Sequence, residues 1–475
     1  MVDATRTEHD LIGEREVPAD VYWGIHSLRA MENFPISDIR ISASPYLVDA
    51  LAAVKQAAAM ANHELGLLDE RRYAAINQAC EEIRSGAFHD QFAVDVIQGG
   101  AGTSTNMNAN EVIANRALEI LGHSKGEYEI VHPNEHVNMS QSTNDVYPTA
   151  VKIALSVAVQ SLDTALDELI AAFDRKAEEF HDVLKVGRTQ MQDAVPMTLG
   201  QEFGTYSHMM RVDRASVTSA VDRLHEINLG ATAIGTQLNA PEGYVALSCK
   251  HLADLTGLPL VSATDLIEST QDCSGFVQLS GALKQIALKL SKISNDLRLL
   301  SSGPRAGVNE IDLPAVQAGS SIMPGKVNPV IPEVVNQVAF QVVGYDHTVS
   351  MAAEAGQLQL NAFEPVICYS LSASIYRLRE AISTFTTRCI DGITANVDLL
   401  HAEVTNSIGL ITALNPYIGY EAATDVAKEA LDTGRGVADL VLEKGLMPAD
   451  QLAEVLRPEV LAQISPRPAA HASIR

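Results

Sequence analysis

The chain has few of the features that mark exported or membrane-bound proteins. Its five cysteines are widely spaced and include no C-x-x-C pair, which disfavours a disulfide framework or a zinc site and predicts reduced thiols in the core. The N-terminus lacks an apolar signal region, and no uninterrupted apolar run approaches the roughly 20 residues of a membrane helix. We therefore expect a cytoplasmic protein with no membrane partner.

Basic residues are also scarce relative to acidic ones. The chain has 34 Lys and Arg against 59 Asp and Glu, a formal net charge of −25 at pH 7. Phosphate binding needs clustered Lys and Arg, so the balance argues against a nucleic-acid partner. The chain has 475 residues, of which 47% are hydrophobic. It can therefore bury a large core and divide into two or three domains.

Apolar residues recur at alternating steps of three and four along three long segments. Such spacing predicts long amphipathic helices that pack as a bundle. The stripes are Leu155, Val159, Leu162, Leu166, Leu169, Phe173, Ala177 and Phe180; Phe276, Leu279, Leu283, Ile286, Leu290, Ile293, Leu297 and Leu300; and Leu371, Ile375, Leu378, Ile382, Phe385 and Cys389. We predict an all-α fold of three helical domains. They are an N-terminal domain over 1–145, a central long-helix bundle over 146–399 and a small C-terminal domain over 400–475.

Residues 319–329, GSSIMPGKVNP, combine hydroxyls, an amine and an amide in a segment that cannot be a regular helix. Pro324 and Pro329 break helical hydrogen bonding, and Gly319 and Gly325 allow backbone angles that are closed to other residues. The segment is typical of a loop that carries chemistry.

Three further segments are suited to holding an anion. They are GGAGTSTNMN at 99–108, VNMSQSTND at 137–145 and GRTQMQDAVP at 187–196. Each is a weak signal alone, because glycine-rich turns more often serve as connections and no P-loop pattern is present. Asn144 or Asp145 can equally cap the next helix, and a helix N-terminus itself favours an anion.

The three segments and the loop at 319–329, in their order along the chain, resemble the substrate-contact regions and signature loop of the fumarase/aspartase superfamily. Residues 13–37 and 406–421 resemble its terminal domains, so the similarity covers nearly the whole chain. Members eliminate across a C–N or C–O bond beside a carboxylate and release fumarate. The resemblance implies a homotetramer with a tetrameric helical core, in which three subunits build each active site.

The leaving group separates the branches of this superfamily. Fumarases usually carry a histidine after Arg-Thr and pair it with a glutamate to activate water, whereas this chain has Gln190 there and keeps Glu333. An amide cannot take up a proton as imidazole does. The resemblance therefore favours the aspartase branch. Its reaction is the reversible deamination of L-aspartate to fumarate and ammonia, by Cβ proton abstraction through an aci-carboxylate intermediate.

Four other readings remain open. They are a fumarate hydratase, a lyase for bulky succinyl substrates, a non-enzymatic protein that kept the fold, and a helical scaffold for protein partners. The intact Ser320, Lys326 and Asn328 argue against the non-enzymatic reading. An assay with aspartate and malate separates the first from the favoured reading, and absence of turnover would favour the other three.

The resemblance assigns roles residue by residue. Ser320 is the general base, acting as an oxyanion, and Lys326 is the matching cation. The predicted β-carboxylate contacts are Thr103, Ser142, Thr143 and Ser321. The predicted α-carboxylate contacts are Thr189, Lys326 and Asn328. Asn144, with Thr103 and Gln190, is predicted to recognise the amino group.

No cofactor is expected. His132 and His136 are spaced four apart, but Pro133 follows the first and no H-E-x-x-H pattern exists, which disfavours metal ligation. Some aspartases respond to divalent metal as an activator, and the sequence leaves such activation undetermined. Two departures from the family pattern are Gln237, where glycine is common, and Tyr345, where asparagine is common.

Overall fold

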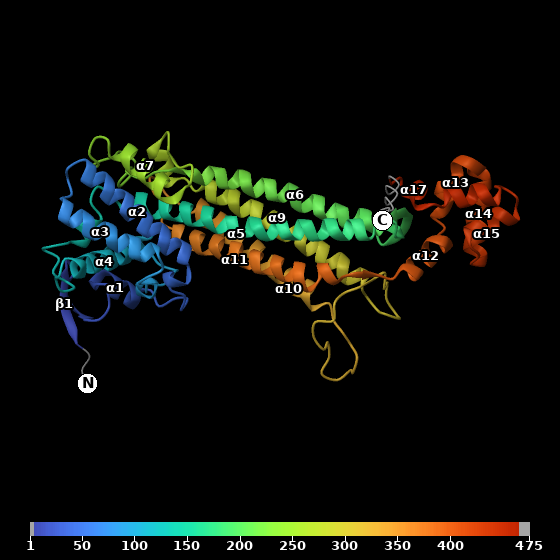
Figure 1. Ribbon diagram of the computed structural model, residues 1–475, viewed down its shortest axis with the longest axis horizontal. Helices are drawn as coiled ribbons and strands as arrows, with labels where there is room; N and C mark the ends of the chain where they lie inside the picture. The colour runs from blue at the N-terminus through green and yellow to red at the C-terminus, as the bar shows by residue number, and fades with distance from the viewer. Residues whose placement is uncertain (1–3, 465–475) are drawn as a thin grey trace, which may run out of the picture. The chain divides into compact units, whose positions relative to one another are not determined.

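The computed structural model describes residues 4–464 and divides the chain into two compact units. Unit 1 comprises the described residues up to 164 together with 213–288 and 338–379, and unit 2 comprises 165–212, 289–337 and 380–464. Five long helices contribute residues to both units and lie side by side within each (Figure 1). They are α5 (Thr143–Glu179), α6 (Leu199–Asp222), α9 (Ser274–Leu300), α10 (Val330–Glu354) and α11 (Glu364–Arg388).

The predicted apolar stripes lie on these helices and face the interior. All eight stripe residues of α9 and all six of the third stripe are buried, as are those of α5 apart from the half-buried Ala177. By length and composition α5 alone among the described helices could cross a membrane, but 72% of its apolar window is buried inside the protein, as in a core helix. The prediction of an all-α fold built on long helices is confirmed.

Unit 1 adds short helices and strands to its share of the long helices. These are β1 (Thr5–Asp10), β2 (Gly13–Pro18), α1 (Ile25–Asn33), α2 (Pro45–Glu64), α3 (Glu70–Arg84), α4 (Thr103–Ile120), β5 (Glu226–Ile227), α7 (Tyr244–Thr256), β6 (Val261–Ser262) and α8 (Leu266–Gln271). The alanine-rich α2 packs against α7 through Ala58, Ala61 and Tyr244. Small side chains let these two helices approach closely.

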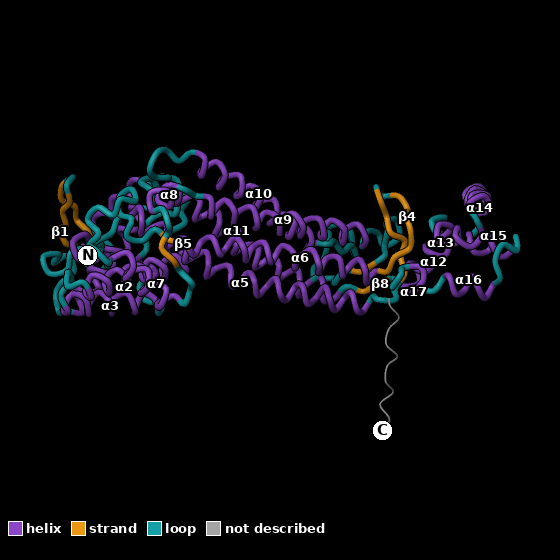
Figure 2. Tube along the Cα trace, turned by 90° about the horizontal axis from the view of Figure 1, so that it is seen from above, coloured by secondary structure: helices purple, strands orange, loops and turns teal. Residues whose placement is uncertain are grey.

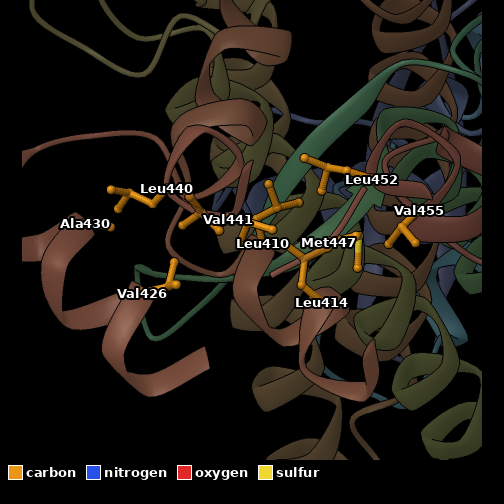
Figure 3. Packing of buried hydrophobic residues seen from close by; sticks show 10 residues of the cluster. Leu410, Leu414, Val426, Ala430, Leu440, Val441, Met447, Leu452 and Val455 are labelled. Atoms are coloured by element: carbon orange, nitrogen blue, oxygen red, sulfur yellow. The ribbon is translucent and has the colours of Figure 1, made fainter. Parts of the chain in front are cut away.

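Unit 2 adds two antiparallel strand pairs and a group of C-terminal helices. The strands are β3 (Leu184–Thr189), β4 (Gln192–Thr198), β7 (Ile311–Asp312) and β8 (Thr394–Ala395), which Figure 2 shows as short segments among helices. The C-terminal helices are α12 (Val397–Asn406), α13 (Leu410–Ile418), α14 (Tyr420–Thr433), α15 (Val437–Glu443), α16 (Ala449–Val455) and α17 (Pro458–Leu461). These helices share a buried apolar cluster of their own, which includes Leu410, Val426 and Leu440 (Figure 3).

Two local features bear on the sequence predictions. Residues 313–329 form neither helix nor strand, as expected of the signature loop, and the five cysteines are buried and free. The hairpin β1–β2 was not predicted, because its first strand carries no apolar alternation. The buried residue of β1 is Glu8, whose carboxylate accepts a hydrogen bond from Ile25 N at 2.8 Å. The division into three domains remains a prediction.

Candidate active site

Two helix N-termini lie together in unit 1 and carry four of the predicted site residues. We call Thr103, Ser142, Thr143 and Asn144 the substrate platform. Helix α4 begins at Thr103 and α5 begins at Thr143, and Asn106 of α4 donates from Nδ2 to Thr143 Oγ1 at 3.1 Å. Helix N-termini expose backbone N–H groups and a positive dipole end, so this pair of termini suits a carboxylate.

The start of α4 depends on a glycine. Gly102 has φ of +89°, and a Cβ there would lie 2.4 Å from the ring of Tyr147. The left-handed turn brings the exposed Thr103 to the first helical position, where its hydroxyl donates to Gly100 O at 2.7 Å. The Thr103 oxygen keeps lone pairs with which to accept a further hydrogen bond.

The start of α5 is fixed by a buried carboxylate. Asp145 Oδ1 accepts from Ser142 N at 3.0 Å, and Oδ2 accepts from Gly230 N at 3.1 Å and Thr232 N at 2.9 Å. Asp145 is 0% exposed. The carboxylate therefore ties the beginning of the helix to the loop around residue 231 and fixes the backbone of the platform.

Asn144 is oriented by a single contact. Its Nδ2 donates to Ala233 O at 2.7 Å. Because a backbone carbonyl can only accept, the amide nitrogen must face it, and Oδ1 is left to accept from an N–H donor. Its backbone carbonyl lacks a helical partner because Pro148 has no N–H, and Asn228 Nδ2 supplies the hydrogen bond at 3.0 Å.

A hub of amide side chains, centred on the half-buried Asn138, supports the platform. Asn138 Oδ1 accepts from Lys55 Nζ at 2.8 Å, from Asn106 Nδ2 at 3.2 Å and from Asn110 Nδ2 at 3.2 Å. Asn106 also reaches Thr143, so the hub connects α2, α4 and α5. A shared network of this kind restricts the rotamers of every member.

Lys55 is the cation of this network. Its side chain is 0% exposed, and its second partner is Gln141 Oε1 at 2.9 Å, so both hydrogen-bond acceptors are neutral amides. Burial lowers its pKa to about 7. The sequence prediction omitted Lys55, although a single lysine within the alanine-rich segment 52–61 was a usable signal.

The signature loop holds its serine with backbone donors. Ser320 Oγ accepts from Ile322 N at 3.2 Å and Met323 N at 2.9 Å. The two ends of the loop meet through Gly319 N to Lys326 O at 2.8 Å. The side chain of Asn328 adds a bond to Gly319 O at 2.6 Å.

Residue 319 must be a glycine because the two ends of the loop approach each other closely there. A Cβ at residue 319 would lie 2.6 Å from Lys326 O. Ser320 and Asn328 are half-buried, whereas Ser321 and the side chain of Lys326 are exposed.

Thr189 and Gln190 lie at the tip of the hairpin β3–β4, where Thr189 pairs with Gln192. Gln190 and Met191 have φ of +53° and +65° and form the turn. Both predicted site residues are exposed. The platform therefore belongs to unit 1, whereas Thr189, Gln190 and the four site residues of the signature loop belong to unit 2.

His132 and His136 hydrogen-bond within a local turn. His132 Nδ1 accepts from Asn134 N at 3.0 Å, and His136 Nδ1 accepts from His132 N at 2.8 Å. Burial lowers the pKa of both imidazoles. Within residues 4–464, no group of three His, Cys, Asp or Glu side chains is arranged to hold a metal ion.

The two departures from the family pattern, Gln237 and Tyr345, differ in their local structure. Gln237 has φ of +58°, a left-handed conformation that favours glycine, which explains why glycine is common there. The ring of Tyr345 packs edge-on against Tyr369 at a centroid distance of 6.1 Å and lies under Arg377 at 5.4 Å.

Known proteins match the chain over nearly its whole length. A family model described as Lyase matches residues 13–344, and one described as Fumarase C C-terminus matches residues 410–463. The chain is 59% identical to an aspartate ammonia-lyase from Pseudomonas canavaninivorans over 463 residues, which cover 97% of each chain. It is 54% identical to the aspartate ammonia-lyase of Escherichia coli K12, covering 96% of this chain and 95% of the relative.

Solved structures agree with these matches. A fumarate lyase:delta crystallin from Brucella melitensis, bound to cobalt, is 54% identical, with a TM-score of 0.95 and coverage of 97% of this chain and 100% of that chain. A class II fumarase from Schistosoma mansoni is 34% identical, with a TM-score of 0.91 and coverage of 97% and 99%.

Proposed function

The chain belongs to the lyase family that includes the aspartate ammonia-lyases and class II fumarases, and from this premise we propose that it deaminates L-aspartate reversibly to fumarate and ammonia. The observation that carries the proposal is 54–59% identity to aspartate ammonia-lyases over nearly the full chain. The amide of Gln190 at the tip of β3–β4, where fumarases carry a histidine, is consistent with ammonia as the leaving group.

We propose that Ser320 removes the Cβ proton. That proton is weakly acidic, since the carbanion forms beside a carboxylate that is already negative. A serine becomes a base only as an alkoxide, which requires preorganised donors. The two backbone N–H groups on Ser320 Oγ are donors of this kind. Lys326, on the same loop, would supply the positive charge.

The substrate platform would bind the β-carboxylate and the amino group. Ser142, Thr143 and Ser321 would donate to the carboxylate, and Thr103 would join them if its hydroxyl turned away from Gly100 O. Asn144 Oδ1, freed by the contact of Nδ2 with Ala233 O, would accept from the ammonium of the substrate. Thr103, with its own proton donated to Gly100 O, would act in the same way, and Gln190 would assist. Thr189, Lys326 and Asn328 would bind the α-carboxylate.

We further propose a cytoplasmic homotetramer that shares its active sites between subunits and needs no organic cofactor. Exposed apolar side chains on α10 support association, since Phe340 is 67% and Met351 54% exposed in the single chain. The platform and the signature loop would then meet across subunit boundaries.

The first experiment supplies purified protein with L-aspartate and, separately, with L-malate, and follows ultraviolet absorbance as the conjugated double bond of fumarate forms. Absorbance growth with aspartate alone supports the proposal. Growth with malate alone would replace it with a fumarate hydratase, and no growth with either substrate would favour a larger substrate or a non-enzymatic role.

Shared active sites can be tested by mixing two impaired variants and assaying them with aspartate well below its KM. Ser320→Ala alters the loop and Asn144→Ala alters the platform, so mixed tetramers would contain some sites with both residues intact. Activity recovered after subunit exchange is expected. Failure to recover any activity from mixed species, or sedimentation as a stable monomer, would contradict the proposal.

A further inference from the structure

The hairpin β3–β4 carries Thr189 and Gln190 at its tip, and its sides lie against other parts of unit 2. The guanidinium of Arg188, next to Thr189, donates through Nη1 to Glu310 Oε1. Its Nη2 lies 3.7 Å from Glu403 Oε2 on α12. Arg188 is therefore held between two carboxylates, one from the segment that precedes the signature loop and one from a C-terminal helix.

Glu310 is the buried centre of this cluster. It is 0% exposed, and its Oε2 lies 2.7 Å from Lys185 Nζ on β3. Lys185 Nζ also donates to Glu202 Oε2 at 2.6 Å. Because a buried carboxylate is costly unless it is paired, Glu310 ties the two cations of β3 to one point.

A β-bulge lies between the two cations. The register shifts between Val186 and Arg188, where Ala194 and Val195 of β4 lie opposite the single residue Gly187 of β3. The extra residue therefore belongs to β4. A Cβ at Gly187 would lie 3.1 Å from Val195 O, so the two strands approach closely at the bulge.

The C-terminal helices also meet β4 directly. A Cβ at Gly409, just before α13, would lie 2.0 Å from Ala194 O. The side chain of Gln201, just after β4, donates to Ala462 O at 2.8 Å. Since α12 to α17 share their own apolar cluster (Figure 3), these contacts connect the hairpin to a packed helical group rather than to a single loop.

We propose that the C-terminal helices position the hairpin tip, with Arg188, Glu310, Glu403 and Gly409 as positioning residues for Thr189 and Gln190. The inference rests on the proposed function in one respect, namely that the tip binds substrate. Displacement of a binding group by about 1 Å can lower catalytic efficiency by about a hundredfold, so contacts that hold the tip affect turnover without touching substrate.

The first test breaks the backbone contact. Gly409 has φ of −55°, which suits alanine, so Gly409→Ala acts chiefly through the clash with Ala194 O rather than through backbone strain. We expect the KM for aspartate to rise about tenfold, kcat to change less, and the amides of 184–198 to exchange faster with deuterium. Gly436→Ala is the matched control. It lies in the same helical group, has φ of −65° and meets its nearest atom at an ordinary 3.4 Å.

The second test is a double-mutant cycle. Glu310→Gln and Arg188→Gln should each raise the KM, and the double variant should cost less than the product of the two single effects, because both remove one contact. Glu403→Gln, at a side chain that is 29% exposed, keeps the test available if a Glu310 variant fails to fold. Arg175→Gln breaks an exposed ion pair with Asp391 in unit 2 and should leave KM unchanged.

Two outcomes overturn the inference. One is a lower melting temperature for Gly409→Ala and Glu403→Gln with unchanged KM and unchanged hairpin exchange, which would mean that these contacts only stabilise the fold. The other is strict additivity of the Arg188 and Glu310 effects. If the wild-type protein fails to act on aspartate, the proposed function fails, and hydrogen exchange of the ligand-free hairpin still decides whether the C-terminal helices hold it.

Discussion

The substrate platform and the signature loop solve different physical problems. Platform residues rest on the buried Asn106 and Lys55, from two helices, and on the half-buried Asn138 that connects them. The hydrogen bonds of the signature loop are local. Ser320 accepts from the backbone of Ile322 and Met323, and residues 319 and 328 join the two ends of the loop. The platform is preorganised before substrate arrives, whereas the loop fixes its serine and leaves Lys326 exposed.

The difference indicates that the platform contributes to substrate binding and the loop to the chemical step. A fixed platform can bind and orient a dicarboxylate without reorganising. A base that acts as an alkoxide needs a water-poor site with donors and a cation, and the exposed loop supplies only part of this. Changes in the loop should therefore reduce kcat, and changes in the platform should raise KM.

Replacing the base should have the largest effect. Ser320→Ala removes the only hydroxyl held by the two backbone donors, and turnover should fall by about 10²–10⁴-fold, the usual range for a lost general base. Steady-state kinetics measure the loss of turnover, and thermal unfolding checks that the variant still folds. Thr387→Ala removes an exposed hydroxyl within α11 and serves as the control. Near-normal turnover of Ser320→Ala would refute its role.

Asn144→Ala should act mainly on substrate binding. Loss of a hydrogen bond to a charged ammonium costs about 1.5–3 kcal/mol, so the KM for aspartate should rise at least about tenfold. Fumarate has no amino group, and its inhibition constant should change much less. Comparison of the two constants, with Thr164→Ala on the exposed face of α5 as control, tests this difference. Equal losses for both ligands would mean that Asn144 does not recognise the amine.

Lys55→Met tests the buried cation through pH. Below a pH of about 7 the folded wild type carries a buried positive charge on Lys55, which destabilises it. As the pH rises, folded Lys55 loses its proton, whereas Lys55 in the unfolded chain keeps its proton until near the ordinary lysine pKa of 10.5. The unfolded state then binds more protons, so wild-type stability should increase relative to the variant across this window. Unfolding free energies at several pH values measure the difference. An exposed-lysine variant, Lys250→Met, reports the effect of losing a surface charge. A pH-independent difference for Lys55→Met would contradict the assignment.

Gln237→Gly should have the smallest effect. A left-handed backbone costs a non-glycine residue about 1–2 kcal/mol, and the greater freedom of glycine in the unfolded chain offsets about 0.4–1 kcal/mol. We expect a net stabilisation of up to about 1.6 kcal/mol in denaturant unfolding. Gln237→Ala retains the strain and should show no gain. A loss of stability on placing glycine there would mean that the Gln237 side chain makes a compensating contact.

Much of the fold and the family assignment could be predicted from the chain. The stripe on α9 identified eight buried residues, because helical periodicity is a local property of sequence. The lyase family was predicted from the signature loop and is confirmed by the family models. The hairpins were missed, since β1 buries a glutamate and the polar run at 187–196 folds back through positive φ at Gln190 and Met191. The assigned catalytic roles remain predictions.

The sequence by itself determined the helices, the loop that cannot be helical and the residue types available for chemistry, because these follow from spacing and backbone restriction. Only the tertiary structure decided which polar groups share a partner. Lys55 and Asn138 are 83 positions apart in the sequence, and Arg188 and Glu310 are 122 positions apart. Local sequence patterns cannot predict contacts between residues this far apart. Burial and hydrogen-bond geometry depend on atoms brought from distant segments, which no local pattern specifies.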